Sequence, residues 1–246
     1  MSLTNTEKRQ LRSDLFLYID GIALVPAISF LKKHDILSKI NLQDEVEVGA
    51  LSQQISANSG YLAVLLRMLA SQGYVEYKEG IDNARYIRRN EATKELSLIS
   101  EKFSRFDNLL DISININEYL FKSNSASYGI IFDTILSEYK EAMKLDISSS
   151  NNYRIFKNIE GYILAPIMVA MTMNGPWNRD TKRFNPDTFS GNRHLFQKII
   201  DFLEIIGFIS IDGTEYSFTD TGLFYIKRSS AFGVTVSYLQ TFSMIN

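Results

Sequence analysis

The hydrophobic pattern of the chain predicts one helix followed by a β-hairpin. Between Tyr61 and Gln72, four leucines recur at i, i+3, i+4 and i+7, the spacing of one apolar helix face. These are Leu62, Leu65, Leu66 and Leu69. Gly73 then suits a left-handed C-cap. Alternating residues at 74–78 and 84–88 predict two strands joined by a turn at 79–83.

A similar pattern occurs in the second half of the chain. Residues 192–206 predict an amphipathic helix that ends before Gly207. The following FISIDGTEYSFT predicts a hairpin whose two-residue turn is Asp212-Gly213. Thr219 and Asp220 are suited to start another helix. The two halves therefore predict the same order of elements.

Three sequence matches indicate an internal duplication. IDGIALVP at Ile19–Pro26 recurs 140 positions later as IEGYILAP at Ile159–Pro166. LLRMLASQGYVEY from Leu65 matches IIDFLEIIGFISI from Ile199 at an offset of 134, and Tyr86-Ile87 matches Tyr216-Ser217 at 130. The order is conserved and the offset shrinks, which indicates one duplicated unit with small deletions in the loops of its second copy.

Each copy predicts a winged helix-turn-helix. A long apolar helix opens the unit, and in the first copy a short helix at Gly49–Ile55 precedes the leucine-rich helix and the hairpin. The expected fold class is mainly α with small β wings, as tandem winged helix-turn-helix units joined by a helical connector. The predicted divisions are 1–97, 98–152 and 153–246, with Ser148–Asn152 as a linker.

Composition narrows the function classes. The 246 residues are 45% apolar and 22% charged, which supports a folded core. The absence of cysteine excludes disulfides and thiolate metal sites and suits a cytoplasmic setting. The N-terminus lacks a signal-peptide pattern. Asp20, Gly21 and Pro26 interrupt the apolar run from Leu15 to Leu31, so no membrane span is expected.

DNA binding is the first function to test for a winged helix. The helix at 61–72 carries one charge, Arg67, and Tyr61, Val64 and Met68 form a second apolar stripe. The basic residues around the predicted wings and before the second helix are Lys78, Arg85, Arg88, Arg89, Arg179, Lys182 and Arg183. With a net charge of −2 we expect these to be solvated rather than bound to phosphates. A winged-helix transcriptional regulator remains the alternative.

No catalytic or metal site is predicted. The two histidines, His34 and His194, accompany no nucleophile–base pattern, and no phosphate-binding or metal-binding motif occurs. Asp20 and Glu160, which precede the repeated glycines, are the one suggestive acidic pair. A polar interface or pocket is one interpretation. Solvent-facing acids beside glycines that allow close helix packing are favoured, because an unpaired buried carboxylate is costly.

The first unit resembles a known module. Its apolar helix and GALSQQISANSGYLAVLLRMLASQGYVEY are similar to the N-terminal winged-helix dimerisation region of S-adenosylmethionine-dependent small-molecule O-methyltransferases. Leu51–Ile55 and Leu69–Val75 carry the resemblance, which covers Leu15 to about Ser97 and more loosely Ile155 to Lys227. The duplication, together with AFGVTVSYLQTF at Ala231–Phe242, looks like methyltransferases associated with polyketide synthases.

This resemblance implies a non-catalytic role in oligomerisation and substrate positioning. In the family, the cofactor loop and the catalytic residues lie in a downstream domain, so S-adenosylmethionine binding is not implied for this chain. The implied partners are downstream methyltransferase or synthase domains, and a homodimer stays open. The two copies are expected to pack about a pseudo-dyad. The candidate interface or pocket residues are Phe16, Ile19, Asp20, Ile22, Ala23, Pro26, Ile159, Glu160, Tyr162, Ile163 and Pro166.

Overall fold

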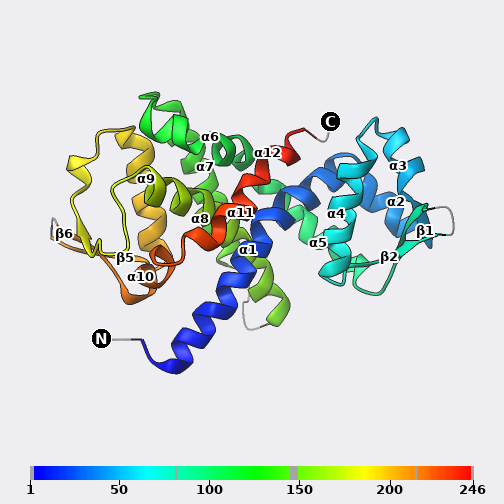
Figure 1. The fold of residues 1–246 in the computed structure, drawn as a ribbon, viewed down its shortest axis with the longest axis horizontal. Coiled ribbons are helices and arrows are strands. Elements are labelled where there is room, and N and C mark those ends of the chain that lie inside the picture. Colours follow the sequence, from blue (N-terminus) through cyan, green and yellow to red (C-terminus); the bar gives the residue numbers. More distant parts are fainter. Residues whose placement is uncertain (1–2, 81–82, 145–148, 214, 245–246) are drawn as a thin grey trace. The chain divides into compact units, whose positions relative to one another are not determined.

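The computed structural model describes residues 3–80, 83–144, 149–213 and 215–244 (Figure 1). It is mainly helical and contains two small antiparallel sheets, which confirms the predicted fold class. The elements of the first half are α1 (Asn5–Lys33), α2 (Ile36–Leu42), β1 (Glu45–Glu47), α3 (Val48–Gln54), α4 (Ser59–Ser71), β2 (Val75–Glu79), β3 (Arg85–Arg89), α5 (Thr93–Phe103), η1 (Ser104–Phe106) and α6 (Leu109–Phe121). Those of the second half are α7 (Ser127–Ala142), α8 (Ser150–Met173), β4 (Arg183–Phe184), η2 (Pro186–Thr188), α9 (Arg193–Ile205), β5 (Ile209–Asp212), β6 (Glu215–Phe218), α10 (Asp220–Ile226), α11 (Ser230–Ser237) and α12 (Leu239–Phe242).

The chain forms two compact units. Unit 1 contains residues 1–22 and 108–237, and unit 2 contains residues 23–107 and 238–246. The helix α1 begins in unit 1 and continues into unit 2. The compact units therefore do not follow the sequence divisions at 97 and 152, which trace the duplication along the chain. A compact unit consists of the segments that pack together, and these segments need not be neighbours in the sequence. The duplicated unit, in contrast, is a continuous stretch of sequence.

Unit 2 contains the first winged helix. Its sheet has the order β1-β3-β2, and Ile87 of β3 lies opposite Val46 on one side and Tyr77 on the other. The four leucines of α4 are buried, as predicted. Gly73 ends α4 with a φ of 81°, and the amide of Tyr74 donates to the carbonyl of Leu69, which confirms the predicted C-cap.

Unit 1 contains the second winged helix, with sheet order β4-β6-β5. Gly207 ends α9 with a φ of 72°, and the amide of Phe208 donates to the carbonyl of Leu203. The hairpin turns at Gly213, whose φ is 61°. In place of the short helix α3 of the first copy, the described residues between β4 and α9 form only the 3-10 turn η2. The duplication is thus preserved in the sheet and the long helix and altered in the connecting segment.

One local prediction needs correction, and two short strands were not predicted. The predicted linker Ser148–Asn152 is mostly the start of α8: the Ser149 side chain accepts a hydrogen bond from the Asn152 amide at 3.2 Å and caps the helix. Ser148 lies outside the described residues, as do Ile81 and Asp82 of the first hairpin turn. The short strands β1 and β4 are absent from the sequence prediction, because two or three residues give no alternation.

The helix α1 is long and apolar enough to cross a membrane by length and composition. It is the one such helix in the described parts of the chain, and 67% of its most apolar window is buried inside the protein. Its repeat partner α8 is also long, 24 residues, and nearly all of its residues from Ile155 to Met171 are buried. Both helices continue through a proline, at Pro26 and Pro166. The long apolar helices are thus core elements in this structure.

Candidate functional site

The repeated glycines mark a crossing of α1 and α8 within unit 1. A Cβ atom on Gly21 would overlap the backbone of Asn158, and a Cβ atom on Gly161 would overlap the backbone of Tyr18. Tyr18 stands three residues before Gly21, and Asn158 stands three residues before Gly161. The contact is therefore reciprocal. The glycine of each helix meets the residue of the other helix that stands three positions before that helix's own glycine. Glycine is required at both places because no side chain fits between the backbones.

A buried charge pair lies beside this crossing. Glu160 is 2% exposed, and the Nζ atom of Lys157 lies 2.6 Å from its Oε2 atom. The Tyr139 hydroxyl of α7 donates to Oε1 of Glu160 at 3.3 Å. Lys157 also donates to the Tyr18 hydroxyl at 3.3 Å. The carboxylate is thus held by groups from three helices, α1, α7 and α8.

Burial determines the electrostatics of this pair. Loss of hydration raises the pKa of the Glu160 carboxyl above its ordinary value, and the Lys157 ammonium opposes this rise. Burial, followed by the charge of Glu160, also raises the pKa of the Tyr139 hydroxyl. The same causes raise the pKa of Tyr18. Both tyrosines are therefore neutral hydrogen-bonding groups at physiological pH.

A second polar group continues along α1 and α8. The Tyr153 hydroxyl donates to Oδ1 of Asp14 at 2.7 Å, and Gln10 Nε2 donates to the same oxygen at 2.9 Å. The Tyr225 hydroxyl of α10 donates to the carbonyl of Leu11 at 3.2 Å, and its ring lies 5.2 Å from that of Tyr18. These contacts fix the N-terminal half of α1 onto α8 and α10.

The structure corrects the interpretation of Glu160 as a solvent-facing acid. Glu160 is buried and is compensated by Lys157, whereas its repeat partner Asp20 is only half-buried. The difference has a simple cause. Position 157 is a lysine in the second copy, and the equivalent residue of the first copy is Leu17. The signal in the sequence was a lysine three residues before the acid, one helical turn away.

The other candidate residues fall into several environments. Ile22, Ile159, Tyr162, Ile163 and Pro166 are buried, and Ile19 is half-buried. Phe16 is 67% exposed and so lies outside the core. Ala23 and Pro26 belong to unit 2, whereas the other candidates belong to unit 1. The structure thus brings together the segment around Gly21 and the segment around Gly161, and leaves Phe16 on the surface.

The cluster is not arranged for catalysis. Its acid is ion-paired, its tyrosines have raised pKa values, and Glu160 and Tyr18 are each 2% exposed, so solvent does not reach them. Among the described residues no group of three or more histidines, cysteines or carboxylates lies in reach of one metal ion. The arrangement fits a structural role, in which a polar network specifies one way of packing two long helices.

The long helix of the second winged helix, α9, packs against α7 along one side. Helix α7 packs along α9: Lys198 forms an ion pair with Asp133 at 2.9 Å, and Tyr139 and Phe202 meet edge to face at 5.2 Å. The His194 ring occupies the space where a Cβ atom of Gly129 would lie. In DNA-binding winged helices the equivalent face enters the major groove. Here α7 occupies one side of α9, while Arg193, Gln197 and Glu204 stay exposed.

The first winged helix presents a different surface. Val64 of α4 is 61% exposed and Tyr61 is 38% exposed. The single charge of this helix, Arg67, pairs with Glu79 of the wing at 3.0 Å. Two further arginines near the wings are neutralised by neighbouring carboxylates: Arg89 by Asp44 in unit 2, and Arg183 by Glu215 in unit 1. These pairs reduce the positive charge near the wings, while Lys78, Arg85 and Arg88 are exposed beside them.

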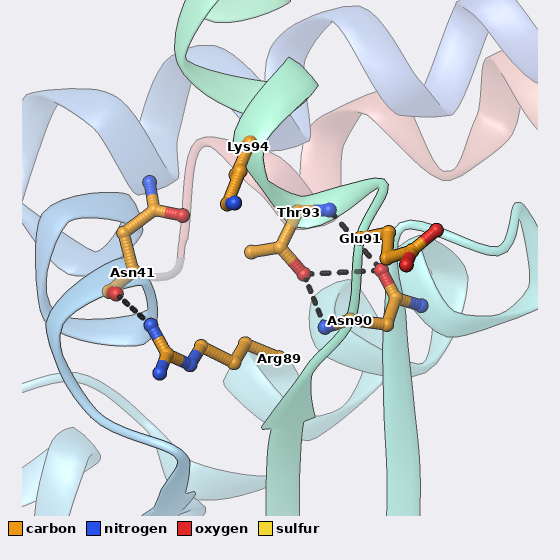
Figure 2. A pocket seen from close by; sticks show the side chains of 6 residues that line it. All are labelled: Asn41, Arg89, Asn90, Glu91, Thr93 and Lys94. Atoms are coloured by element: carbon orange, nitrogen blue, oxygen red, sulfur yellow. Dashed lines mark hydrogen bonds between the residues drawn. The ribbon is translucent and has the colours of Figure 1, made fainter.

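A polar pocket of about 480 Å³ lies between α2, β3 and α5 in unit 2 (Figure 2). Arg89 and Asn41 lie on one side, where an Arg89 nitrogen donates to the carbonyl of Asn41 at 3.1 Å. On the other side Asn90 and Thr93 form reciprocal hydrogen bonds that start α5. Lys94 also lines the hollow. The sequence pattern did not indicate this pocket, because Asn41 stands far from the other lining residues in the chain.

Two segments of the chain match known family models. Residues 11–77 match the family model of the AprA N-terminal domain, and residues 160–246 match that of the AprA winged helix domain. The second match agrees with the winged helix of unit 1. A search of curated proteins found no match. The chain therefore combines two segments similar to AprA domains, and neither match carries a catalytic assignment.

Proposed function

We propose that this chain is a non-catalytic region for oligomerisation and substrate positioning in a larger S-adenosylmethionine-dependent methyltransferase of polyketide or other secondary metabolism. The observation that carries the proposal is the packing of α9, one side of which contacts α7 through Lys198 and Phe202. Because part of this helix packs within the chain, its surface is less free for a DNA groove, which favours a structural role over DNA recognition. The methyltransferase-like pattern at Leu69–Val75 adds support, and the match to a winged helix domain agrees with a winged-helix region.

The reciprocal contact at Gly21 and Gly161 also supports the proposal. In a symmetric dimer each interface residue meets its counterpart from the partner. Here Gly21 faces Asn158 and Gly161 faces Tyr18 within one chain. The duplicated helices thus make internally the kind of contact that two subunits make in a dimer. Any further partner, including downstream catalytic domains or a second copy, would attach through other surfaces.

The test compares the chain with the native polypeptide that carries it. Methyl transfer from labelled S-adenosylmethionine is expected for the native polypeptide and not for residues 1–246 alone. Calorimetry should likewise detect no S-adenosylmethionine binding to the isolated chain. Methyl transfer by the isolated chain would contradict the non-catalytic role. Absence of transfer by a native polypeptide of larger mass would remove the methyltransferase assignment.

A second measurement addresses the rival function. Binding to a random DNA duplex is followed by fluorescence anisotropy at low and at physiological salt. A DNA-binding regulator loses affinity by about 10³-fold or more over such a range when several phosphates are contacted. We expect no binding at low salt. Tight, steeply salt-dependent binding would favour the transcriptional regulator.

A further inference from the structure

A second pocket, of about 340 Å³, lies at the surface of unit 1 where α11 packs against the end of α8, and Met173 at its edge is 74% exposed. Its walls include the apolar side chains of Val169, Met173 and Ile226. Arg179, Ser230 and Gly233 also line it. This volume is within the range of pockets that hold small organic molecules. We call this cavity the α8–α11 pocket.

Gly233 is the unusual residue of this pocket. Each of the other twelve glycines either has a positive φ or would place a Cβ atom within 4 Å of a neighbour. Gly233 has neither property: a Cβ atom added to it would meet nothing within 4 Å, and the residue sits inside α11. Glycine in a helix costs about 1 kcal/mol relative to alanine. Neither packing nor backbone geometry requires this glycine, but its missing side chain leaves the pocket open.

The polar groups of the α8–α11 pocket have one sign of charge. Arg179 supplies a guanidinium, and among the described residues it has no ion-pair partner. Asn178, Ser229 and Ser230 add an amide and two hydroxyls, and no carboxylate lines the pocket within the described parts of the chain. Apolar walls combined with one cation and several hydrogen-bond donors suit an amphipathic anion.

We propose that the α8–α11 pocket binds a short acyl chain that ends in a carboxylate. The acyl chain lies along Val169, Met173 and Ile226 in the space left by Gly233, and the carboxylate meets Arg179. The proposal rests on this pocket alone and goes beyond the assembly role proposed above. It holds or fails independently of methyl transfer and of DNA binding.

The test uses octanoate as the probe, with 1-octanol as the uncharged comparison. Amide shifts of the isotope-labelled chain are followed by NMR during titration, and affinity is taken from the same curves. Octanoate should shift the amides of Ser230 and Gly233 in a saturable way. Gly233→Leu should weaken octanoate binding by about tenfold or more, because the added side chain fills the apolar space. Gly233→Ala, the matched control, should change the affinity much less.

Arg179→Gln tests the carboxylate separately. It should weaken octanoate binding by about fivefold, the effect of one exposed charge, and leave 1-octanol binding unchanged. Thermal melting should show that each variant remains folded, since position 233 has no neighbour to displace. The proposal is overturned if octanoate causes no saturable shifts near Gly233. It is also overturned if Gly233→Leu binds octanoate as well as the unaltered chain.

Discussion

The long helices α4 and α9 occupy the same position in the two winged helices but have different surroundings. Both begin at an asparagine cap, Asn58 and Asn192, and both end at a glycine with positive φ. Helix α7 packs on one side of α9 and buries Phe202 completely, whereas the exposed face of α4 includes Tyr61 and Val64. The same sequence pattern thus forms a helix that packs against another helix in one copy and a helix with an exposed apolar surface in the other. The winged-helix fold by itself therefore does not determine what its long helix contacts.

The largest difference is expected at one pair of equivalent positions, Phe202 in α9 and Met68 in α4. Phe202 is completely buried against Tyr139, and Met68 is only half-buried. Phe202→Ala should lower the free energy of unfolding by about 3–5 kcal/mol because it leaves a cavity. Met68→Ala should cost less than about 1.5 kcal/mol, because little buried volume is lost. Urea unfolding measures both, and equal costs would contradict the comparison.

The repeated acids differ in the same way, and this gives a pH-dependent prediction. Lys157→Leu introduces the residue that the first copy has at this position and removes the cation beside buried Glu160. The free energy of unfolding should fall by about 3 kcal/mol or more near pH 8, where an unpaired buried carboxylate is most costly. The loss should be found by urea unfolding of both proteins.

The sign of the pH dependence follows from the raised pKa of Glu160. A carboxyl whose pKa is higher in the folded state holds its proton more tightly there than in the unfolded chain. Its contribution to stability is complete below the unfolded pKa and is lost as the pH rises through the folded pKa. Lys157 opposes this rise in the pKa, so Lys157→Leu should raise the pKa of Glu160 further, and the defect should shrink as the pH is lowered from about 8 toward about 5. A defect that does not change with pH would contradict an ionised, buried Glu160.

The helix caps give a smaller difference. Asn192 is 2% exposed; its side-chain oxygen accepts from the Leu195 amide and its nitrogen donates to the carbonyl of Ser125. Asn58 is exposed and only caps α4. Asn58→Ser should be tolerated within about 0.5 kcal/mol, because serine caps helices equally well. Asn192→Ser should cost about 1–3 kcal/mol more, since the buried Ser125 contact is lost. Similar costs from the two changes in thermal or urea unfolding would argue against the buried contact.

The smallest effect is expected at Val64, the position equivalent to Lys198. Lys198 pairs with Asp133 of α7, whereas Val64 is 61% exposed. Val64→Lys should change the free energy of unfolding by less than about 0.5 kcal/mol. Lys198→Val should lower the free energy of unfolding by about 1 kcal/mol. In the Asp133→Ala background the same change should cost much less, because the ion pair is already lost, and a double-mutant cycle measures this. A destabilising effect of Val64→Lys similar to that of Lys198→Val would indicate that α4 is also covered.

The sequence by itself determined the local elements and their repetition. Leucine spacing, Gly73 and Gly207 as C-caps, and the Asp212-Gly213 turn predicted both long helices and both hairpins, because these features depend on neighbouring residues. The short strands β1 and β4 form only when β3 and β6 are present to pair with them. Their existence could not be inferred from two or three residues.

Only the tertiary structure decided what the repeated segments contact. The sequence marked Glu160 and Gly161 as notable, but burial of the acid depends on Lys157 and Tyr139 meeting it from α8 and α7. The two compact units, the packing of α7 on α9 and the pocket beside Gly233 also depend on which distant segments pack together. The physical reason is the range of the interactions. Backbone propensity and capping act within a helical turn, whereas burial, ion pairing and cavities are properties of several elements assembled in space.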